Sequence, residues 1–522
     1  MAKVLVLDQL IRLIKSLDNA ELAELKRHLR FIKLNSKKKI NQVQQLIDLI
    51  ALKNVFTYPE LVKIVTPNGT SYSFNKVAKK AVDYILELLV SENLMAKKYS
   101  IRDSFREQLL IKRELLKVLN LSFRGHDETV KRLLKPIVIR ASKFELYNEL
   151  LEALYILQEF SLTDDPTKFD KLSREIKFYE DCRTKLFKAK MLYRQYGNLS
   201  ISKASLESVS LYNSKAIRDL NSDFKSTKSA NIKCYYYLLK LEMSYREQDF
   251  VKEFKVAKEL LDLLKSSPAV YSKGRISLIY TNLTNTADAS CQFKLSNTLA
   301  RNSIYWSSFE VNLNQIYSYR GLIKSLIFLN KNHEAINQID KLIKNKFIDQ
   351  YPYFNTYFKY LKAVSSFLLL DFNLSNKTLH NLKELEKDKE GWNIWIQVLR
   401  IQVYLEMQRF SESEYLIENL RKYLERNREK YQIKERLFLI SKLFIELKTC
   451  NFDYKKAAKK KSDVLNKLKS LDKDCRWDGR TPEMILFHDW FESKKDNRPY
   501  KANFEPYRID LKVDEAEFES VS

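Results

Sequence analysis

The chain has 522 residues, of which only seven are glycine and nine are proline, while 30% are charged. So few helix breakers predict an almost wholly helical protein and exclude a β-rich fold, whose turns need those residues. No two glycines lie within 40 residues of each other. Phosphate-binding loops need two or more glycines within a few positions, so the nucleotide enzymes that such loops define are excluded as well.

The charge is strongly basic, with 92 Lys and Arg against 66 Asp and Glu and a net charge of +26. Such a balance is typical of proteins that bind nucleic acid or another anionic surface. A lysine-rich proteome would produce the same balance without any such role. Both interpretations stay open at this point.

Cysteine usage and hydropathy indicate a cytoplasmic protein. The five cysteines are scattered and form no C-x-x-C pair, which predicts reduced, packed thiols. The start of the chain carries Asp8, Arg12 and Lys15 at helical spacing, unlike a signal peptide. No apolar run is long enough to predict a membrane span, so we expect no membrane among the partners.

Residues 1–100 are predicted to form a helical domain of their own. It ends in a short helix within "FTYPELVKIV", a turn in "TPNGTSYS" and a long helix at about 74–93. This order has the outline of a helix-turn-helix, in which Lys76, Lys79 and Lys80 would lie near the start of the DNA-contacting helix. The favoured interpretation is a helical cap on one end of a solenoid.

Residues 101–225 are predicted to form a first solenoid section of long helices. The segments "RDSFREQLLIKRELLKVLNLSF" and "KRLLKPIVIRASKFELYNELLEALYILQEF" have helical apolar spacing, with Pro136 at a kink or a start. A loop is expected in "SLTDDPTKFD". The long polar helix that follows, Asp170 to about Tyr196, is expected to end at Gly197.

Residues 226–475 show a period of about 40 residues, which predicts regular antiparallel helix pairs and an α-solenoid. Six landmark residues mark the period, at steps of 43, 40, 39, 38 and 42 residues: Phe250, Phe293, His333, Phe372, Phe410 and Phe452. Each lies between two apolar-periodic segments. We therefore expect them to wedge between paired helices, so that replacing Phe372 or Phe410 by Ala costs about 3–5 kcal/mol.

Residues 476–522 depart from this period. A turn at Asp478–Pro482 precedes a short helix that would cap the last repeat with Ile485, Phe487, Trp490 and Phe491. The stretch from about Asn497 to Ser522 is polar and acidic. We expect it to be mobile or to serve as a short docking segment.

The repeat segments carry a family resemblance. "MQRFSESEYLIENLRKYL", "NKNHEAINQIDKLIKN" and "QDFVKEFKVAKELLDLL" resemble the turn and second helix of tetratricopeptide repeats, although the period is longer and the small residues and terminal proline are missing. The openings "IKSLDNAELAELKRHLRFIKL" and "AVDYILELL" resemble uncharacterised Lys-rich helical-repeat proteins of Bacteroidetes. The resemblance implies a cytoplasmic repeat protein with no settled activity.

Residues that could support chemistry are few. None of the five histidines pairs with another at helical spacing, and no Cys/His cluster has zinc spacing. His488, Asp489 and Glu492 share a short helix and could form an acid/base or metal site, but solvated carboxylates are the favoured interpretation. We expect no enzymatic activity, no metal and no cofactor.

The densest basic run is "DYKKAAKKKSDVLNKLK", in which Lys455, Lys456, Lys459 and Lys460 fall on neighbouring faces of one helix. It is the best candidate for a strip that contacts phosphates, with a solvated helix face as the alternative. The tyrosine-rich helices are more simply explained by packing than by base stacking.

The sequence thus predicts a non-enzymatic scaffold or adaptor that binds a protein or peptide through the surface of a helical-repeat solenoid. The alternative is a nucleic-acid-associated regulator that uses the basic helices or the N-terminal helical domain. The partner itself is not identified by any motif.

Overall fold

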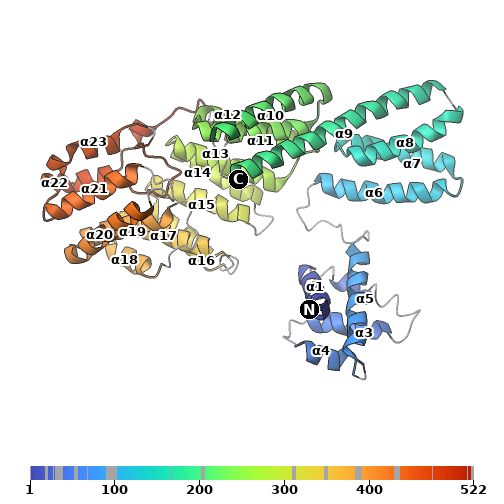
Figure 1. Cartoon of the computed structure of the whole chain (residues 1–522), viewed down its shortest axis with the longest axis horizontal. Coiled ribbons are helices and arrows are strands. Elements are labelled where there is room, and N and C mark those ends of the chain that lie inside the picture. Colours follow the sequence, from blue (N-terminus) through green and yellow to red (C-terminus); the bar gives the residue numbers. More distant parts are fainter. Residues whose placement is uncertain are drawn as a thin grey trace. The chain divides into compact units, whose positions relative to one another are not determined.

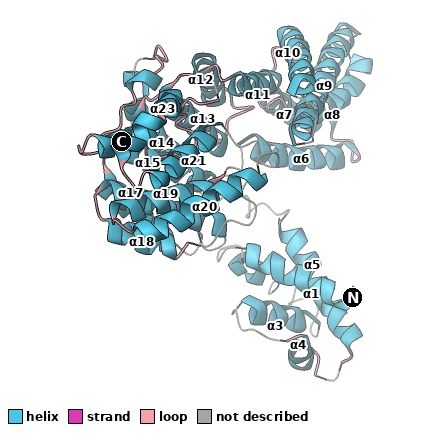
Figure 2. Ribbon diagram, turned by 60° about the vertical axis from the view of Figure 1, so that its left-hand side comes forward, coloured by secondary structure: helices cyan, strands magenta, loops and turns pink. Residues whose placement is uncertain are grey.

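The computed structural model of the chain is all-helical, as predicted. It describes residues 2–17, 22–27, 29, 39–51, 57–67, 69–89, 103–164, 166–201, 206–307, 313–345, 348, 351–382, 391–427, 435–472, 474–513 and 515–518. Within these ranges there is no strand, and no helix is long and apolar enough to cross a bilayer. Figure 2 shows helices joined by loops throughout. Neighbouring helices pack in chain order, which fits an α-solenoid.

The first compact unit, Met1–Tyr99, is a small helical bundle. Its helices include α1 (Ala2–Ser16), α3 (Lys39–Ala51), α4 (Tyr58–Val65) and α5 (Ser71–Leu89). Helix α5 lies against the other three and buries Phe74 and Ala78 completely. The predicted turn joins α4 to α5. A Cβ on Gly69 would lie 2.9 Å from the Cβ of Thr66, so this close turn requires glycine.

The second compact unit, Ser100–Ser522, contains the remaining helices (Figure 1). They are α6 (Asp103–Ser122), α7 (Asp127–Lys143), α8 (Tyr147–Asp164), α9 (Pro166–Ile201), α10 (Leu206–Thr227), α11 (Ala230–Glu247), α12 (Phe250–Ser266), α13 (Lys273–Ala289), α14 (Phe293–Ser307), α15 (Leu313–Phe328), α16 (Asn332–Ile343), α17 (Pro352–Leu368), α18 (Phe372–His380), α19 (Trp392–Glu406), α20 (Phe410–Asn427), α21 (Glu435–Thr449), α22 (Tyr454–Lys460), α23 (Ser462–Lys469) and α24 (Phe487–Lys495), with 3₁₀ turns η3 (Glu505–Tyr507) and η4 (Glu515–Phe518). The first helices of successive pairs, α13, α15, α17 and α19, contact one another in turn.

Most turns between paired helices are built in the same way. A residue with positive φ lies two positions before the second helix: Gln248, Cys291, Asn330, Leu370 and Gln408. The next backbone N–H then donates to a carbonyl five residues back, as from Asp371 to Ser366 at 2.9 Å, which closes the first helix. Asp371 also caps the second helix, because its side chain accepts from the Leu374 N–H at 2.9 Å.

The landmark residues mark where second helices begin. Phe250, Phe293, Phe372 and Phe410 are the first residues of α12, α14, α18 and α20, His333 is the second residue of α16, and Phe452 lies two residues before α22. They do not form a uniform layer of wedges.

Burial differs from one landmark to the next. Phe250 and Phe293 are buried, whereas His333 is exposed and Phe410 is 41% exposed. The Phe410 ring stacks on Phe452 of the next pair, with 4.6 Å between ring centres, and its other side faces solvent. Since a ring that stays partly in water contributes less burial energy, the predicted cost of Phe410→Ala is too high.

One detail of residues 101–225 differs from prediction. Gly197 lies inside α9, which continues to Ile201, and a Cβ on it would meet nothing within 4 Å. It is therefore no helix cap. Pro136 lies inside α7, so of the two positions predicted for it the helix start is excluded.

The C-terminal segment, here residues 474–518, packs along the helices of the second unit. The Lys324 ammonium of α15 donates to the Gly479 carbonyl at 2.6 Å, and the Tyr360 hydroxyl of α17 donates to the Pro482 carbonyl at 2.9 Å. Arg436 of α21 pairs with Glu483 at 2.5 Å, with both side chains almost fully buried. This segment therefore covers the first helices α15, α17 and α21.

Of the two predictions for the residues beyond Asn497, a mobile tail or a docking segment, the described residues fit docking, here onto helices of the same chain. The Ile509 N–H donates to the Ser290 carbonyl at 3.1 Å, and the Gln292 amide donates back to the Ile509 carbonyl at 2.7 Å. Tyr507 and Phe518 are buried. These apolar side chains are spaced too widely to form an amphipathic helix, so the polar composition between them concealed their contribution to the core.

Candidate binding groove

An open cavity of about 860 Å³ lies in the first part of the second unit. We call it the open groove. It is lined by Ser104, Phe105, Gln108, Phe144, Glu145, Leu146, Tyr147, Asn148, Glu149, Arg183, Thr184, Leu186, Phe187, Lys190, Asn231, Tyr235, Ala269 and Arg275. These residues belong to α6, α8, α9, α11, the start of α13 and the turns beside them. Helices far apart in sequence are thus brought to one surface.

Glu145 fixes one wall of the groove. It lies in the α7–α8 turn with a positive φ of 53°. Its carboxylate accepts from the Ser229 hydroxyl at 2.6 Å, the Ala230 N–H at 2.6 Å, and the Asn231 N–H and side-chain amide at 3.1 and 2.9 Å. These donors form the start of α11, so the carboxylate caps that helix and complements its dipole. The negative charge of Glu145 therefore stabilises the start of α11.

The second carboxylate of the groove is also satisfied internally. Glu149 is buried and accepts from the Gln108 side-chain amide at 2.7 Å. The Lys112 ammonium lies 3.5 Å from the same oxygen. Neither groove carboxylate is left to bind a cation from outside.

Three cations that line the groove differ from these carboxylates in their contacts. Arg183 and Lys190 are exposed on α9, and Arg275 is half-buried on α13. Among the described residues, none of their side chains makes an ion pair or a hydrogen bond. The groove consequently presents positive charge that the described part of the fold does not neutralise, which favours an anionic ligand.

Aromatic rings lie beside these cations. Phe187 is 66% exposed and Phe105 is 50% exposed, and both line the groove. Arg183, Phe187 and Lys190 are four and three residues apart on α9, so they share one face of that helix. Two exposed rings that line one cavity together form an apolar surface on which a ligand could pack.

Tyr147 lines the groove, and the buried Cys182 thiol interacts with it. Burial, followed by the charges of Asp181 and Glu145, raises the pKa of the Cys182 thiol to about 11. Burial likewise raises the pKa of Tyr147. Both groups are neutral near pH 7, and the described residues contain no cluster of His, Cys, Asp and Glu that could hold a metal.

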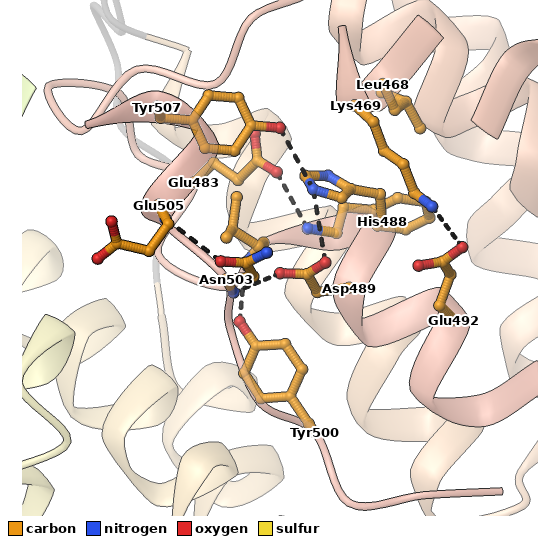
Figure 3. A network of polar contacts seen from close by, with 12 residues as sticks. Leu468, Lys469, Glu483, His488, Asp489, Glu492, Tyr500, Asn503, Glu505 and Tyr507 are labelled. Carbon is orange, nitrogen blue, oxygen red and sulfur yellow. Dashed lines mark hydrogen bonds and ion pairs between the residues drawn. The ribbon is translucent and has the colours of Figure 1, made fainter. Parts of the chain in front are cut away.

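The helix with His488, Asp489 and Glu492 is occupied by structural contacts (Figure 3). Arg436 lies 3.2 Å from Nδ1 of His488, and Tyr507 lies 3.3 Å from its Nε2. Arginine can only donate, so Nδ1 accepts. Burial and the Arg436 charge lower the pKa of His488 to about 3, which keeps the ring neutral.

The two carboxylates of that helix are engaged as well. Asp489 accepts from the Asn503 N–H at 2.7 Å, and Glu492 pairs with Lys469 at 2.5 Å. The three side chains that the sequence grouped together are therefore engaged in contacts that hold the C-terminal segment in place.

The predicted lysines lie outside the groove, in separate places. On α22, Lys456 pairs with Asp453 at 3.2 Å and Lys460 with Glu446 at 3.3 Å, while Lys455 and Lys459 are exposed. Carboxylates thus pair with two of the four candidate lysines.

The lysines of the N-terminal unit are on α5. Lys76 and Lys79 are exposed and Lys80 is half-buried. The Lys76 ammonium lies 4.6 Å from the centre of the Tyr72 ring, and that of Lys80 lies 5.7 Å from the Tyr84 ring. Within the described residues these lysines have no ion-pair partner.

Sequence reasoning missed the open groove. One local signal was present, because "CRTKLFKAK" places Phe187 on the polar side of the long helix α9. The rest of the site is assembled from helices that only the fold brings together.

Comparison with known proteins adds nothing to this description, since the chain matches no family model, no curated protein and no solved structure. The site is therefore interpreted from its own residues.

Proposed function

We propose that this protein is a non-enzymatic helical-repeat scaffold that binds another protein or a peptide through the open groove. The observation that carries the proposal is a cavity of about 860 Å³ in which exposed aromatic rings lie beside cations that no described residue neutralises. Buried arginine and aromatic side chains are the groups that contribute most to protein interfaces.

The arrangement of the helices supports the same proposal. The first helices of the pairs from α11 to α21 begin at residues 230, 273, 313, 352, 392 and 435, a spacing of about 40 residues. We take this as a tetratricopeptide-like repeat. Stacked helix pairs of this kind form extended surfaces that hold polypeptide segments.

The C-terminal segment is an internal precedent for such binding. It lies over several first helices and is held by an Arg–Glu pair, by donors to backbone carbonyls and by aromatic contacts. The open groove offers the same kinds of group, and none of its lining residues belongs to the described part of this segment.

The test uses the full-length chain, tagged and purified from its native cells after nuclease treatment. Arg183→Glu combined with Arg275→Glu reverses two groove charges. Arg174→Glu combined with Lys177→Glu reverses two exposed charges of α9 that do not line the groove. Quantitative mass spectrometry should find a protein that the original chain and the control retain and the groove variant loses.

An unchanged set of retained proteins in the groove variant would contradict the proposal. So would the loss of every retained protein on nuclease treatment, which would indicate that nucleic acid tethers them.

Binding of nucleic acid by the N-terminal unit is the second candidate function. Tyr72, Lys76 and Lys79 are exposed at the start of α5, four and three residues apart on one face. Phosphates are favoured at the start of a helix by the backbone N–H groups and by the dipole. Asp83 continues the same face, so the positive stretch is confined to about the first three turns.

Duplex DNA binding by the full chain, measured at increasing salt, tests this second candidate. The variant Lys76→Glu with Lys79→Glu should bind more weakly and show a shallower salt dependence. Lys455→Glu with Lys459→Glu, which changes two exposed lysines of α22, is the control for net charge. Equal losses in both variants would exclude α5 as the contact.

A further inference from the structure

We infer that the ligand of the open groove is an extended acidic peptide segment that carries an aromatic side chain. The inference rests on the proposed protein-binding function and names the chemistry of the partner. Three observations lead to it: the charge balance of the groove, its exposed rings, and an internal segment of the same chemistry that the chain already binds.

Charge balance selects an acidic partner. Glu145 and Glu149, the two carboxylates that line the groove, are committed to the start of α11 and to α6. Arg183, Lys190 and Arg275 have no counter-charge among the described residues. The groove therefore has an excess of positive charge, and carboxylates of a ligand would meet it from α9 on one side and α13 on the other.

The exposed rings select an aromatic or large apolar side chain. Phe187 projects from α9 between the two cations of that helix, and Phe105 comes from α6. A ligand ring packed against them removes apolar surface from water and adds the preference of aromatic pairs for edge or offset contact. A ligand with carboxylates alone would leave both rings exposed.

The chain's own residues 515–518, with the sequence Glu-Ala-Glu-Phe, show this recognition at a different place. Glu517 pairs with Lys258 of α12. The Phe518 ring is buried, with its centre 6.0 Å from that of Phe254, and the Asn302 amide of α14 donates to the Phe518 carbonyl at 3.0 Å. A cation, a phenylalanine and an asparagine together hold an acidic–aromatic segment.

The open groove repeats that combination. Arg183 and Lys190 correspond to the cation, Phe187 to the ring, and the exposed Asn148 of α8 to the amide that reaches a ligand backbone. No part of the described chain occupies the open groove as residues 515–518 occupy their own site. A peptide fits this set better than a nucleic acid, because the combination of groups that it repeats holds a peptide segment in this same chain.

Fluorescence anisotropy with the full-length chain tests the inference. The probe is a short labelled peptide of glutamate and phenylalanine residues. Three counterparts accompany it: glutamine in place of glutamate, lysine in place of glutamate, and alanine in place of phenylalanine. The acidic aromatic peptide should bind most tightly, and added salt should weaken it.

Variants locate the binding. Arg183→Glu should weaken the acidic aromatic peptide by at least about tenfold, because attraction becomes repulsion at the ligand carboxylate. Lys177→Glu, an exposed change on α9 outside the groove, should leave binding unchanged. Lys258→Glu should also leave it unchanged, which separates the groove from the site of residues 515–518.

Each remaining outcome overturns the inference. Equal binding of the acidic and lysine peptides would exclude charge recognition, and equal binding of the alanine counterpart would exclude a role for the rings. If a single-stranded oligonucleotide bound more tightly than the acidic aromatic peptide, and if Arg183→Glu abolished that binding, the groove would be assigned to nucleic acid.

The two proposals fail in distinguishable ways. If Arg183→Glu still releases the cellular partner but the acidic peptide does not bind, the ligand chemistry is wrong and the scaffold function stands. If neither the partner nor the peptide depends on Arg183, the open groove is not the binding surface.

Discussion

Two parts of the second unit present similar side chains but differ in what lies on them. Over α15, α17 and α21, the C-terminal segment covers the helices, and arginine, lysine and tyrosine side chains hold it in place. At α6, α8, α9 and α11, comparable cations and rings face an open cavity. In the covered part these side chains stabilise the fold itself, and in the open part the described residues do not occupy them.

The comparison makes an energetic prediction. Substitutions under the C-terminal segment should lower the free energy of unfolding, whereas substitutions in the open groove should affect binding and leave stability almost unchanged. Four experiments test this division, in decreasing order of the expected effect.

Arg436→Ala should have the largest effect. The guanidinium is 4% exposed and pairs with Glu483, which is 1% exposed, while also donating to the Leu468 and Cys475 carbonyls at 2.7 and 2.9 Å. Its removal leaves a buried carboxylate without its cation, so urea unfolding should show a loss of about 3–5 kcal/mol.

The control is Arg421→Ala, whose ion pairs with Glu418 and Glu425 lie on the surface of α20 and should contribute little. Should Arg436→Ala fail to fold, Glu483→Gln keeps the shape of the pair and still removes one charge. Equal, small losses in the buried and the surface variants would contradict the structural role of this pair.

Asp288, at the end of α13 beneath Gly479, should give the covered part a pH dependence. Burial raises its pKa from 3.8 to about 6, against the opposing effects of Lys324 and of the hydrogen bond from Ser296. Because the folded state holds the proton more tightly, the stabilisation is complete below pH 3.8 and is lost as pH rises through about 6.

Unfolding of the original chain and of Asp288→Asn, compared across this pH range, measures the contribution. The stability of the original chain relative to the variant should fall by roughly 3 kcal/mol as pH rises, since every tenfold difference in proton affinity between the folded and unfolded states corresponds to about 1.4 kcal/mol. A difference that stays constant with pH would show that Asp288 is solvated in solution.

Gly479→Ala should have an intermediate effect. A Cβ at this position would lie 2.3 Å from the Asp288 carbonyl oxygen and 2.8 Å from its carbon, and backbone cannot move aside as a flexible side chain would. The C-terminal segment must shift, at a cost of about 1–3 kcal/mol. Hydrogen exchange should accelerate in residues 476–513.

Gly197→Ala is the matched control, because nothing lies within 4 Å of the new Cβ inside α9. It should stabilise the protein by about 0.5–1 kcal/mol through helix propensity. If hydrogen exchange in the C-terminal segment accelerated in both variants, the acceleration could not be attributed to the contact of Gly479 with Asp288.

These residues also show what sequence could and could not reveal. Periodicity and the scarcity of glycine predict the all-helical class. Four of the five landmark phenylalanines coincide with helix starts, because a turn and its cap are local features. Burial of a landmark is not local. Phe410 and Phe293 both begin a second helix, yet only Phe293 is buried. Its ring packs against Phe328 of α15 and against Phe504 of the C-terminal segment.

The C-terminal segment and the open groove lie beyond local patterns for the same reason. Gln292 and Ile509 are 217 residues apart in sequence and hydrogen-bonded in the fold. Glu145 reaches the start of α11 across 85 residues. Contacts between residues so far apart produce no periodic pattern in the sequence. For this reason the sequence allowed a mobile tail and did not predict the groove.

Phe187→Ala should have the smallest effect on stability and so gives the sharpest test of the comparison. The ring is 66% exposed, so its removal should change the free energy of unfolding by no more than about 0.5 kcal/mol. The acidic aromatic peptide should nevertheless bind more weakly, because its ring loses the surface on which it packs. A large loss of stability would mean that the groove belongs to the core, and unaltered binding at unaltered stability would mean that Phe187 serves neither purpose.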